Sequence, residues 1–272
     1  MTFIAPLQSR ALLELSGGEV VSFLQNLVTC DVEGLKANEA TFGALLTPQG
    51  KILFDFFLLR NEDGFLLDVD SEVRDDLAKR LMFYKLRADV SIKNSDKLVS
   101  ASWAGENQNG FIDPRSSLLG TRIYSANQTT TATEEDWQTM RIAVGMPHSG
   151  LDFELGSTFP HEVLMDQFGG VDFTKGCYVG QEVVSRMHHR GTTRSRVVCV
   201  EGTGGSLPIA GTELLADDRT IGTMGSASHN KGLATVRLDR LKTATEAGTE
   251  ITVSGMALIF SRPQFANYEW PL

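Results

Sequence analysis

The chain has 272 residues, of which 42% are hydrophobic and 22% charged, and its formal net charge is −9. This composition is that of a soluble globular protein with enough apolar residues for a packed core, and the acidic charge argues against a broad footprint on nucleic acid or an anionic membrane. No run of about 18 apolar residues predicts a membrane span, and the N-terminal sequence predicts no signal peptide. Three cysteines are too few for a disulfide framework, so we expect reduced thiols and a cytoplasmic protein.

The N-terminal part of the chain predicts an α+β fold. Residues 11–15 suit a strand, and Ser16 and Glu19 fit a capping box that begins a helix. Residues 40–70 read as three strands separated by two turns. A helix with apolar residues at four-residue spacing and a strand at residues 88–93 follow. This order of elements favours an α+β sandwich with an antiparallel sheet.

The rest of the chain divides into a poorly patterned middle and a strand-rich end. Residues 100–130 contain two loop-like segments, and a helix is predicted around residues 137–144. Residues 148–176 show no regular period but carry enough apolar side chains to be ordered, and a short helix is predicted at residues 181–190. From residue 195 onward short strand-like runs alternate with turns, which predicts a small barrel or sandwich and a domain boundary near residue 194.

The segment DFTKGCYVGQE, residues 172–182, concentrates chemically useful side chains. Gly176 precedes Cys177, and a glycine lets the backbone approach a ligand closely. Lys175 lies two residues before the cysteine, at the expected start of a helix, and both a cation and a helix N-terminus favour a thiolate. The alternative from local chemistry is a buried structural cysteine. Cys30 and Cys199 lie in apolar surroundings and are predicted to be core residues.

Histidines and arginines cluster after this segment. His188 and His189 are adjacent helix positions that face different ways, and three cysteines cannot complete a four-thiolate cluster site, so we predict no bound metal. A basic run is either a solvated face or a site for carboxylates or phosphates. The run consists of Arg186, Arg190, Arg194 and Arg196, with Lys175 near it in sequence.

Several acidic residues interrupt apolar stretches. Asp55, Asp68 and Asp70 lie within predicted strands, and surface exposure is the simpler expectation for them. Asp68 and Asp70 point to the same side of their strand because side chains alternate. Glu162 lies in the irregular segment, where contact with a ligand is more plausible.

The string KGCYVGQEVVSRMHHRG, residues 175–191, resembles the signature of the YgfZ family, whose relatives include mitochondrial assembly factors for iron–sulfur proteins. FLQNLVTCDV, LLTPQGKILFDF and PHEVLMDQFGGVDF resemble other blocks of that family. The family is similar to the glycine cleavage T-protein, a tetrahydrofolate-dependent aminomethyltransferase. The resemblance implies three small domains around a central channel that holds folate. Residues 1–194 would form two interleaved subdomains, the second roughly at 40–125, and residues 195–272 a β-barrel.

The resemblance carries over unevenly to individual residues. The T-protein grips the pterin with the glutamate of a Thr-Pro-x-Glu motif, and Glu162 occupies the matching place here. The acidic pair of the T-protein reads Phe54-Asp55, and the loss of one acid weakens the case for aminomethyl transfer. Asp70 corresponds to an asparagine of the T-protein. Cys177 has no counterpart there and distinguishes the YgfZ branch.

The function implied is that of a tetrahydrofolate-binding accessory factor for the synthesis or repair of iron–sulfur proteins, with assembly or client proteins as partners. The candidate catalytic residues are Cys177 and, second, Asp55. The candidate folate-binding residues are Glu162, Asp70, Lys175, Tyr178, Gln181, Glu182, Arg186 and Arg190. A folate-dependent one-carbon transferase and a factor in folate-dependent tRNA modification are the alternatives. Neither a membrane nor tight direct binding of tRNA is expected.

Overall fold

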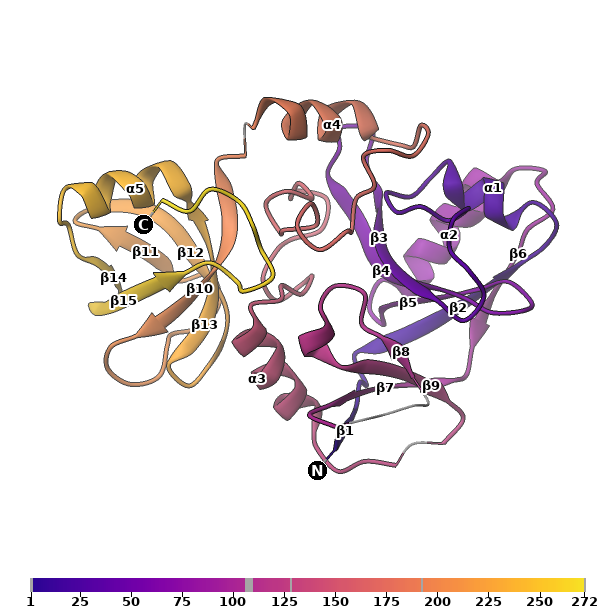
Figure 1. The fold of residues 1–272 in the computed structure, drawn as a ribbon, viewed down its shortest axis with the longest axis horizontal. Coiled ribbons are helices and arrows are strands. Elements are labelled where there is room, and N and C mark those ends of the chain that lie inside the picture. Colours follow the sequence, from indigo (N-terminus) through magenta and orange to yellow (C-terminus); the bar gives the residue numbers. More distant parts are fainter. Residues whose placement is uncertain (1, 106–109, 128, 192, 272) are drawn as a thin grey trace. The chain divides into compact units, whose positions relative to one another are not determined.

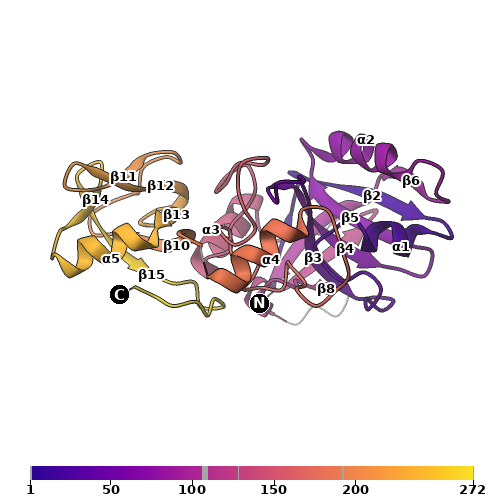
Figure 2. The ribbon, with the colours of Figure 1, turned by 90° about the horizontal axis from the view of Figure 1, so that it is seen from above.

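The structure is a computed structural model that describes residues 2–105, 110–127, 129–191 and 193–271. The chain forms two compact units, each built from two stretches of sequence (Figures 1 and 2). Unit 1 comprises Met1–Trp137 and Phe168–Val183, and unit 2 comprises Gln138–Gln167 and Val184–Leu272. The boundary predicted near residue 194 and the limits of the subdomains stay predictions.

A five-stranded antiparallel sheet forms the core of unit 1. Its order is β3 (Ala40–Leu46), β4 (Ile52–Arg60), β5 (Phe65–Asp70), β2 (Arg10–Ser16) and β6 (Ser91–Ser95). Helices α1 (Val20–Gln25) and α2 (Arg74–Lys85) contribute buried apolar side chains to the same cluster as the sheet, among them Leu24 and Leu77. The predicted α+β class is therefore confirmed. The predicted capping box is wrong, because the Glu19 carboxylate accepts the Asp89 amide at 2.6 Å and caps nothing in α1.

A second sheet of unit 1 was not predicted. It has the order β1 (Phe3–Pro6), β7 (Leu98–Trp103), β9 (Thr121–Ser125) and β8 (Phe111–Ile112). A short 3₁₀ helix, η1 (Ser117–Leu119), lies between β8 and β9. Of the two loop-like segments predicted in residues 100–130, the first connects β7 to β8, and the second leads from β9 to the helix that begins at Glu134. Residues 106–109 and 128 of these segments lie outside the described residues.

The C-terminal part of unit 2 is a closed barrel, as the short even strands predicted. Its strands run in the order β10 (Ser195–Gly202), β13 (Lys231–Arg237), β12 (Arg219–Ser228), β11 (Glu213–Ala216), β14 (Ile251–Val253) and β15 (Met256–Ser261). Helix α5 (Leu238–Glu246) buries Leu241 and Ala244 in the barrel cluster. Among the helices of the described residues, none has the length and apolar character that crossing a membrane requires.

Two further helices lie where the sequence predicted them. Helix α3 runs over Glu134–Val144, three residues longer at its start than predicted, and α4 runs over Gln181–Arg190. The irregular segment between these helices is ordered, as expected. Within unit 2, Arg141 of α3 donates to the Asp152 carboxylate at 2.7 Å, and Asp152 accepts the Ser226 amide of β12 at 2.7 Å. This buried ion pair fastens the start of the irregular segment to the barrel.

Candidate functional site

Cys177 lies on an exposed turn that precedes α4. Its side chain is exposed, and α4 begins only at Gln181, so the thiol is not within the first turn of the helix as the sequence predicted. A side chain built at Gly176 would meet no atom within 4 Å, so no close approach explains that glycine. The structure thus presents the thiol to solvent and excludes the alternative of a buried structural cysteine.

Lys175 does not act on Cys177 as expected from the sequence. Its ammonium donates to the backbone oxygens of Val28 at 2.8 Å and Cys30 at 2.6 Å. The same cation lies 5.5 Å from the centre of the Tyr178 ring. Partial burial lowers the pKa of Lys175. Lys175 therefore attaches the cysteine segment to the chain after α1, which leaves the activation of the thiol by this lysine without structural support.

Further hydrogen bonds attach the same two segments. The Thr29 hydroxyl is buried, donates to the Gly170 oxygen at 2.6 Å and accepts the Ala44 amide at 2.8 Å. The Asp172 amide donates to the Thr29 oxygen at 2.9 Å. Thr29 thus connects strand β3 to the segment that leads to Cys177. The sequence did not single out Thr29, whose one signal was a hydroxyl residue beside the buried Cys30.

The turn after β3 supports the other side of the cysteine segment. Gly180 has a φ of 81°, and a side chain there would lie 2.6 Å from the Thr47 oxygen. Gly50, with a φ of 80°, faces it, since a side chain there would lie 3.3 Å from the Gly180 oxygen. Only glycine fits such a close approach at a positive φ. Cys177 is therefore exposed on a segment held on both sides within unit 1.

Losing the charged anchor is expected to loosen this segment. In Lys175→Met the Val28 and Cys30 oxygens lose a charged donor, and such a bond contributes about 1.5–3 kcal/mol. We expect urea unfolding of Lys175→Met to give a free energy of unfolding lower by that amount. Lys79→Met, which removes an exposed lysine of α2, serves as the matched control. An unfolding curve for Lys175→Met equal to that of the control would show that the anchor is dispensable.

Other residues of the block divide into buried and exposed. Tyr178 is buried, and burial raises its pKa to about 12. The Gln181 amide donates to the Gly176 oxygen at 3.3 Å, and the Glu182 side chain is exposed. Glu182 is thus accessible and Gln181 partly so, whereas Tyr178 is buried.

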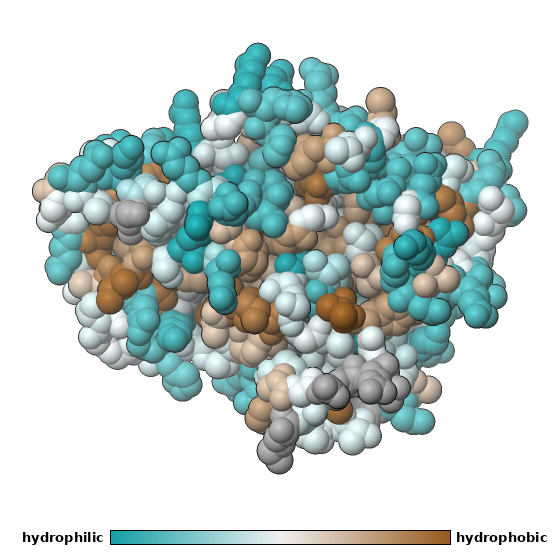
Figure 3. Space-filling view, viewed as in Figure 1, coloured by the Kyte–Doolittle hydropathy of each residue, from teal (hydrophilic) through white to brown (hydrophobic). Residues whose placement is uncertain are grey.

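The basic run is not a single face. Arg186, Arg190 and Arg194 are exposed, and Figure 3 shows hydrophilic side chains over the top of the view, where α4 lies in Figure 1. Arg196 differs, because it is buried and forms two bonds, of 2.8 and 2.9 Å, with the Asp166 carboxylate. The three exposed arginines remain available to an anion. Arg196 instead forms a buried ion pair with Asp166, which has a structural role.

Glu162 lies in unit 2, in a turn of the irregular segment. Its Oε2 atom accepts the Phe159 amide at 2.8 Å, while its backbone oxygen accepts the Val197 amide of β10 at 2.8 Å. The side chain is partly buried. Its orientation is thus set by one hydrogen bond, and no hydrogen bond to Oε1 is found in the part of the chain that the structure describes.

The acids of the five-stranded sheet are less exposed than predicted. Asp68 is wholly buried and Asp55 is 9% exposed, so the expectation of surface positions is wrong for both. Asp70 is partly buried at the end of β5, where its Oδ1 accepts the Glu72 amide at 2.9 Å. The apolar side chains on both faces of β5 were the signal that this strand is covered on both sides.

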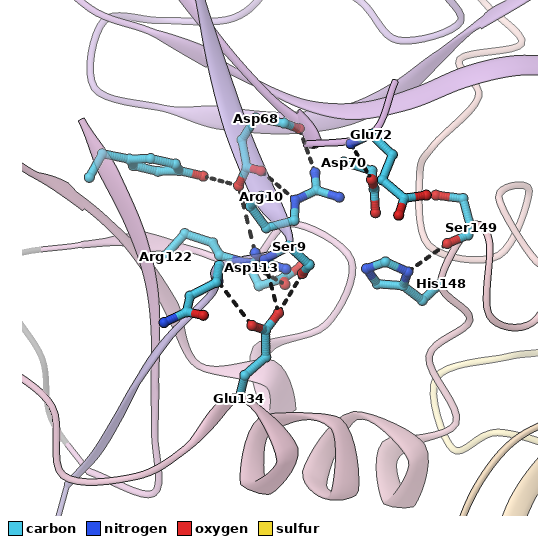
Figure 4. Close-up of polar contacts among 12 residues, drawn as sticks. Ser9, Arg10, Asp68, Asp70, Glu72, Asp113, Arg122, Glu134, His148 and Ser149 are labelled. Atoms are coloured by element: carbon cyan, nitrogen blue, oxygen red, sulfur yellow. Dashed lines mark hydrogen bonds and ion pairs between the residues drawn. The ribbon is translucent and has the colours of Figure 1, made fainter. Parts of the chain in front are cut away.

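Asp68 belongs to a buried charge cluster of unit 1 that the sequence did not reveal (Figure 4). It accepts Arg10 Nε at 2.6 Å and the Tyr124 hydroxyl at 2.9 Å. Arg122 lies 3.6 Å from Asp68 and 3.8 Å from Asp113. The guanidinium of Arg122 is 4.4 Å from the centre of the Phe57 ring. The cluster joins the two sheets of unit 1, since Asp68 comes from β5 and Arg122 from β9.

Comparison with solved structures defines the fold. The chain matches the crystal structure of the glycine cleavage system aminomethyltransferase T from Bartonella henselae with a TM-score of 0.77 and 16% identity. The match covers 99% of this chain and 87% of that one. The protein therefore has the aminomethyltransferase fold, as the resemblance implied. At this identity the likeness extends to the fold alone.

Sequence comparison defines the family. Residues 194–268 match the model of the CAF17 C-terminal β-barrel domain. The chain is 32% identical to the mitochondrial iron–sulfur cluster assembly factor IBA57 homolog of Mycosarcoma maydis, over 91% of this chain and 68% of that protein. The human IBA57 protein is 28% identical over 87% of this chain and 78% of its own. The chain belongs to the IBA57 family of iron–sulfur cluster assembly factors.

These relatives also correct one prediction. They are named as mitochondrial proteins, so the prediction of a cytoplasmic location is wrong. The chain spans 56% of the length of the Neurospora crassa relative, with which it is 28% identical. The wider family assignment made from the sequence is confirmed, and folate binding stays a prediction.

Proposed function

We propose that the chain acts in the synthesis or repair of iron–sulfur proteins, with Cys177 as its reactive residue. The observation that carries this proposal is an exposed thiol on a segment held by Lys175, Thr29 and Gly180. Membership of a family of iron–sulfur cluster assembly factors supports the same role. A fixed and accessible thiol suits either transient thiol chemistry or ligation of a cluster.

If Cys177 ligates an iron–sulfur cluster, the burial of the other two cysteines indicates that a partner protein supplies the remaining ligands. Cys30 is buried, and burial raises its pKa to about 12. Cys199 is mostly buried in β10, and burial raises its pKa to about 11. Within the described residues no group of three or more histidine, cysteine, aspartate or glutamate side chains could hold a metal ion. Cys177 would then supply one thiolate and an assembly or client protein the remaining ligands.

A complementation experiment, in which this chain replaces a family member that the cells lack, tests this role. Cells that lack their own member of the family would express this chain, directed to the compartment of the missing protein. We expect the activity of iron–sulfur enzymes to recover, while an enzyme without a cluster serves as the internal control. Normal amounts of folded chain without recovery of the iron–sulfur enzymes would reject the proposal.

We further propose that the chain binds a reduced folate and that Glu162 contacts the pterin. The fold of an aminomethyltransferase supports this, as does the partly buried carboxylate with Oε2 held by the Phe159 amide. A carboxylate accepts two parallel N–H bonds from an aminopyrimidine edge. Exposed Arg186 and Arg190 would meet the glutamate carboxylates of the folate. Asp55 is buried next to Phe54, so binding is better supported than one-carbon transfer.

Equilibrium titration with tetrahydrofolate tests the pterin contact. Hydrogen bonds to a charged group contribute about 1.5–3 kcal/mol, so Glu162→Ala is expected to bind roughly 10- to 100-fold more weakly than the wild type. Glu154→Ala, in the same irregular segment but exposed, is the matched control and is expected to bind normally. Equal affinities of Glu162→Ala and wild type would contradict the assignment.

A further inference from the structure

Strand β6 (Ser91–Ser95) forms an open edge of the five-stranded sheet of unit 1. It pairs on one side with β2. In the part of the chain that the structure describes, the backbone of these residues makes no hydrogen bond outside that pairing. Because successive residues of an antiparallel strand direct their N–H and C=O groups to opposite sides, every second residue of β6 points both groups away from β2.

The other sheet edges among the described residues are covered or very short. The Thr29 amide donates to the Ala44 oxygen of β3 at 2.9 Å, and its hydroxyl accepts the Ala44 amide at 2.8 Å. The Thr131 and Ala132 amides donate to the Ile4 oxygen of β1 at 2.9 and 3.0 Å. The barrel is closed, and β8 has two residues. Proteins usually cover or shorten their sheet edges, which sets the open edge at β6 apart.

The two faces of β6 differ in chemistry. Ile92 packs against the apolar cluster that the sheet forms with α1 and α2. Lys93 points to the opposite face and is exposed, and it forms no ion pair with any residue that the structure describes. Glu14, opposite it on β2, accepts the Ser95 hydroxyl at 2.8 Å and lies 4.0 Å from Lys97. A strand added at this edge therefore meets an apolar side chain on one face and an unpaired cation on the other.

A second copy of the chain fits this edge poorly. The twofold antiparallel pairing that uses all five residues of β6 is centred on Lys93. It would place the lysines of the two copies directly opposite each other, and like charges in that position are destabilising. The edge thus favours a different chain with an acidic residue at that place.

We propose that β6 accepts an extended segment of a partner protein as a sixth, antiparallel strand of the sheet. The segment carries an apolar residue opposite Ile92 and, next to it, an acidic residue opposite Lys93. Its main-chain hydrogen bonds supply affinity, and the two side chains select the segment, as in other cases of strand addition. The inference concerns unit 1 alone and does not depend on the proposed roles of Cys177 and folate.

Amide hydrogen exchange with synthetic peptides tests this docking edge on the full chain. The probe is a short peptide in which valine and glutamate alternate, added at millimolar concentration. It should slow amide exchange within Ser91–Ser95 and leave the exchange of the covered strand β1 unchanged. The same peptide methylated at every backbone nitrogen cannot donate main-chain hydrogen bonds and should protect β6 much less.

Charge reversal at Lys93 tests the selection of the segment. Lys93→Glu turns an opposite-charge pair across the strands into a like-charge pair, so it should weaken binding of the acidic peptide about two- to thirtyfold. The same variant should bind a peptide of alternating valine and lysine more tightly than the wild type does. Lys36→Glu, which changes an exposed lysine of unit 1 outside the sheet, is the matched control and should bind both peptides like the wild type.

Four results would overturn the inference. The first is the absence of protection of β6 by the acidic peptide, and the second is equal protection by the methylated peptide. The third is equal binding of the acidic peptide by Lys93→Glu and Lys36→Glu. The fourth is protection of β6 that grows with the concentration of the chain itself, without peptide, which would assign the edge to a second copy.

Discussion

Arg141→Met is expected to lower the free energy of unfolding of the chain by about 3–5 kcal/mol, the cost of breaking a buried ion pair by removing one partner. Arg141 is 1% exposed and donates to the Asp152 carboxylate, to the Met146 oxygen and to the Ser226 hydroxyl. Methionine fills a similar volume but leaves the Asp152 carboxylate buried without its cation. The same change also releases the start of the irregular segment from β12.

Urea unfolding followed by circular dichroism measures this effect. Arg237→Met is the matched control, because Arg237 also pairs with an aspartate, Asp239, but at the surface of the same unit. An exposed pair contributes little, so the control is expected to unfold at the wild-type urea concentration. Unfolding of Arg141→Met at that same concentration would show that the irregular segment does not depend on the buried pair.

Asp113→Asn is expected to have an effect of similar size, about 3–5 kcal/mol, in unit 1. Both oxygens of Asp113 accept Arg115, at 3.0 and 2.8 Å, and Arg122 lies 3.8 Å away. Arg115 in turn lies 4.6 Å from the centre of the Phe57 ring. Asparagine keeps the shape but leaves the buried Arg115 guanidinium without its counter-charge and Arg122 with Asp68 alone. Asp76→Asn, which removes one side of an exposed pair in α2, is the control.

The Asp113 carboxylate also makes the stability of the chain depend on pH in the acidic range. Burial alone would raise the pKa of Asp113, but the charge and hydrogen bonds of Arg115 outweigh burial and lower it. A lowered pKa in the folded state means that the stabilisation is complete above the usual aspartate pKa and is lost as the pH falls through the lowered value. The stability of the wild type should therefore fall more steeply than that of Asp113→Asn on acidification below about pH 4. Parallel pH curves would contradict this account of Asp113.

Local patterns were sufficient to predict some of the elements. The sequence from Gln181 to Arg190 predicted α4 with its observed ends, and the short strands after Ser195 predicted the barrel. Helix α4 is set by contacts between residues close in sequence, and the barrel strands carry local strand patterns although β10 pairs with the distant β15. The second sheet of unit 1 was missed because β8 has only two residues and its partners are separated by loops.

The features of the site that the sequence did not predict are contacts between residues far apart in the sequence. Lys175 was expected to act on Cys177, two residues away, yet its ammonium binds the Cys30 oxygen, 145 residues away. Asp68 was expected at the surface because an acid in a strand is usually exposed, and its partner Arg10 lies 58 residues away. No local pattern shows such pairs. The family resemblance identified the block around Cys177, and the structure showed how that block is held.

The most direct measurement of the central claim compares two cysteine variants in cells that lack their own member of the family. Cys177 is exposed, so alanine at this position should not disturb folding. Cys199, in contrast, is mostly buried. Cys177→Ala should accumulate normally yet fail to restore the activity of iron–sulfur enzymes. Cys199→Ala, the matched control, should restore that activity once it reaches the same amount of folded protein. Full recovery with Cys177→Ala would contradict the role assigned to this thiol.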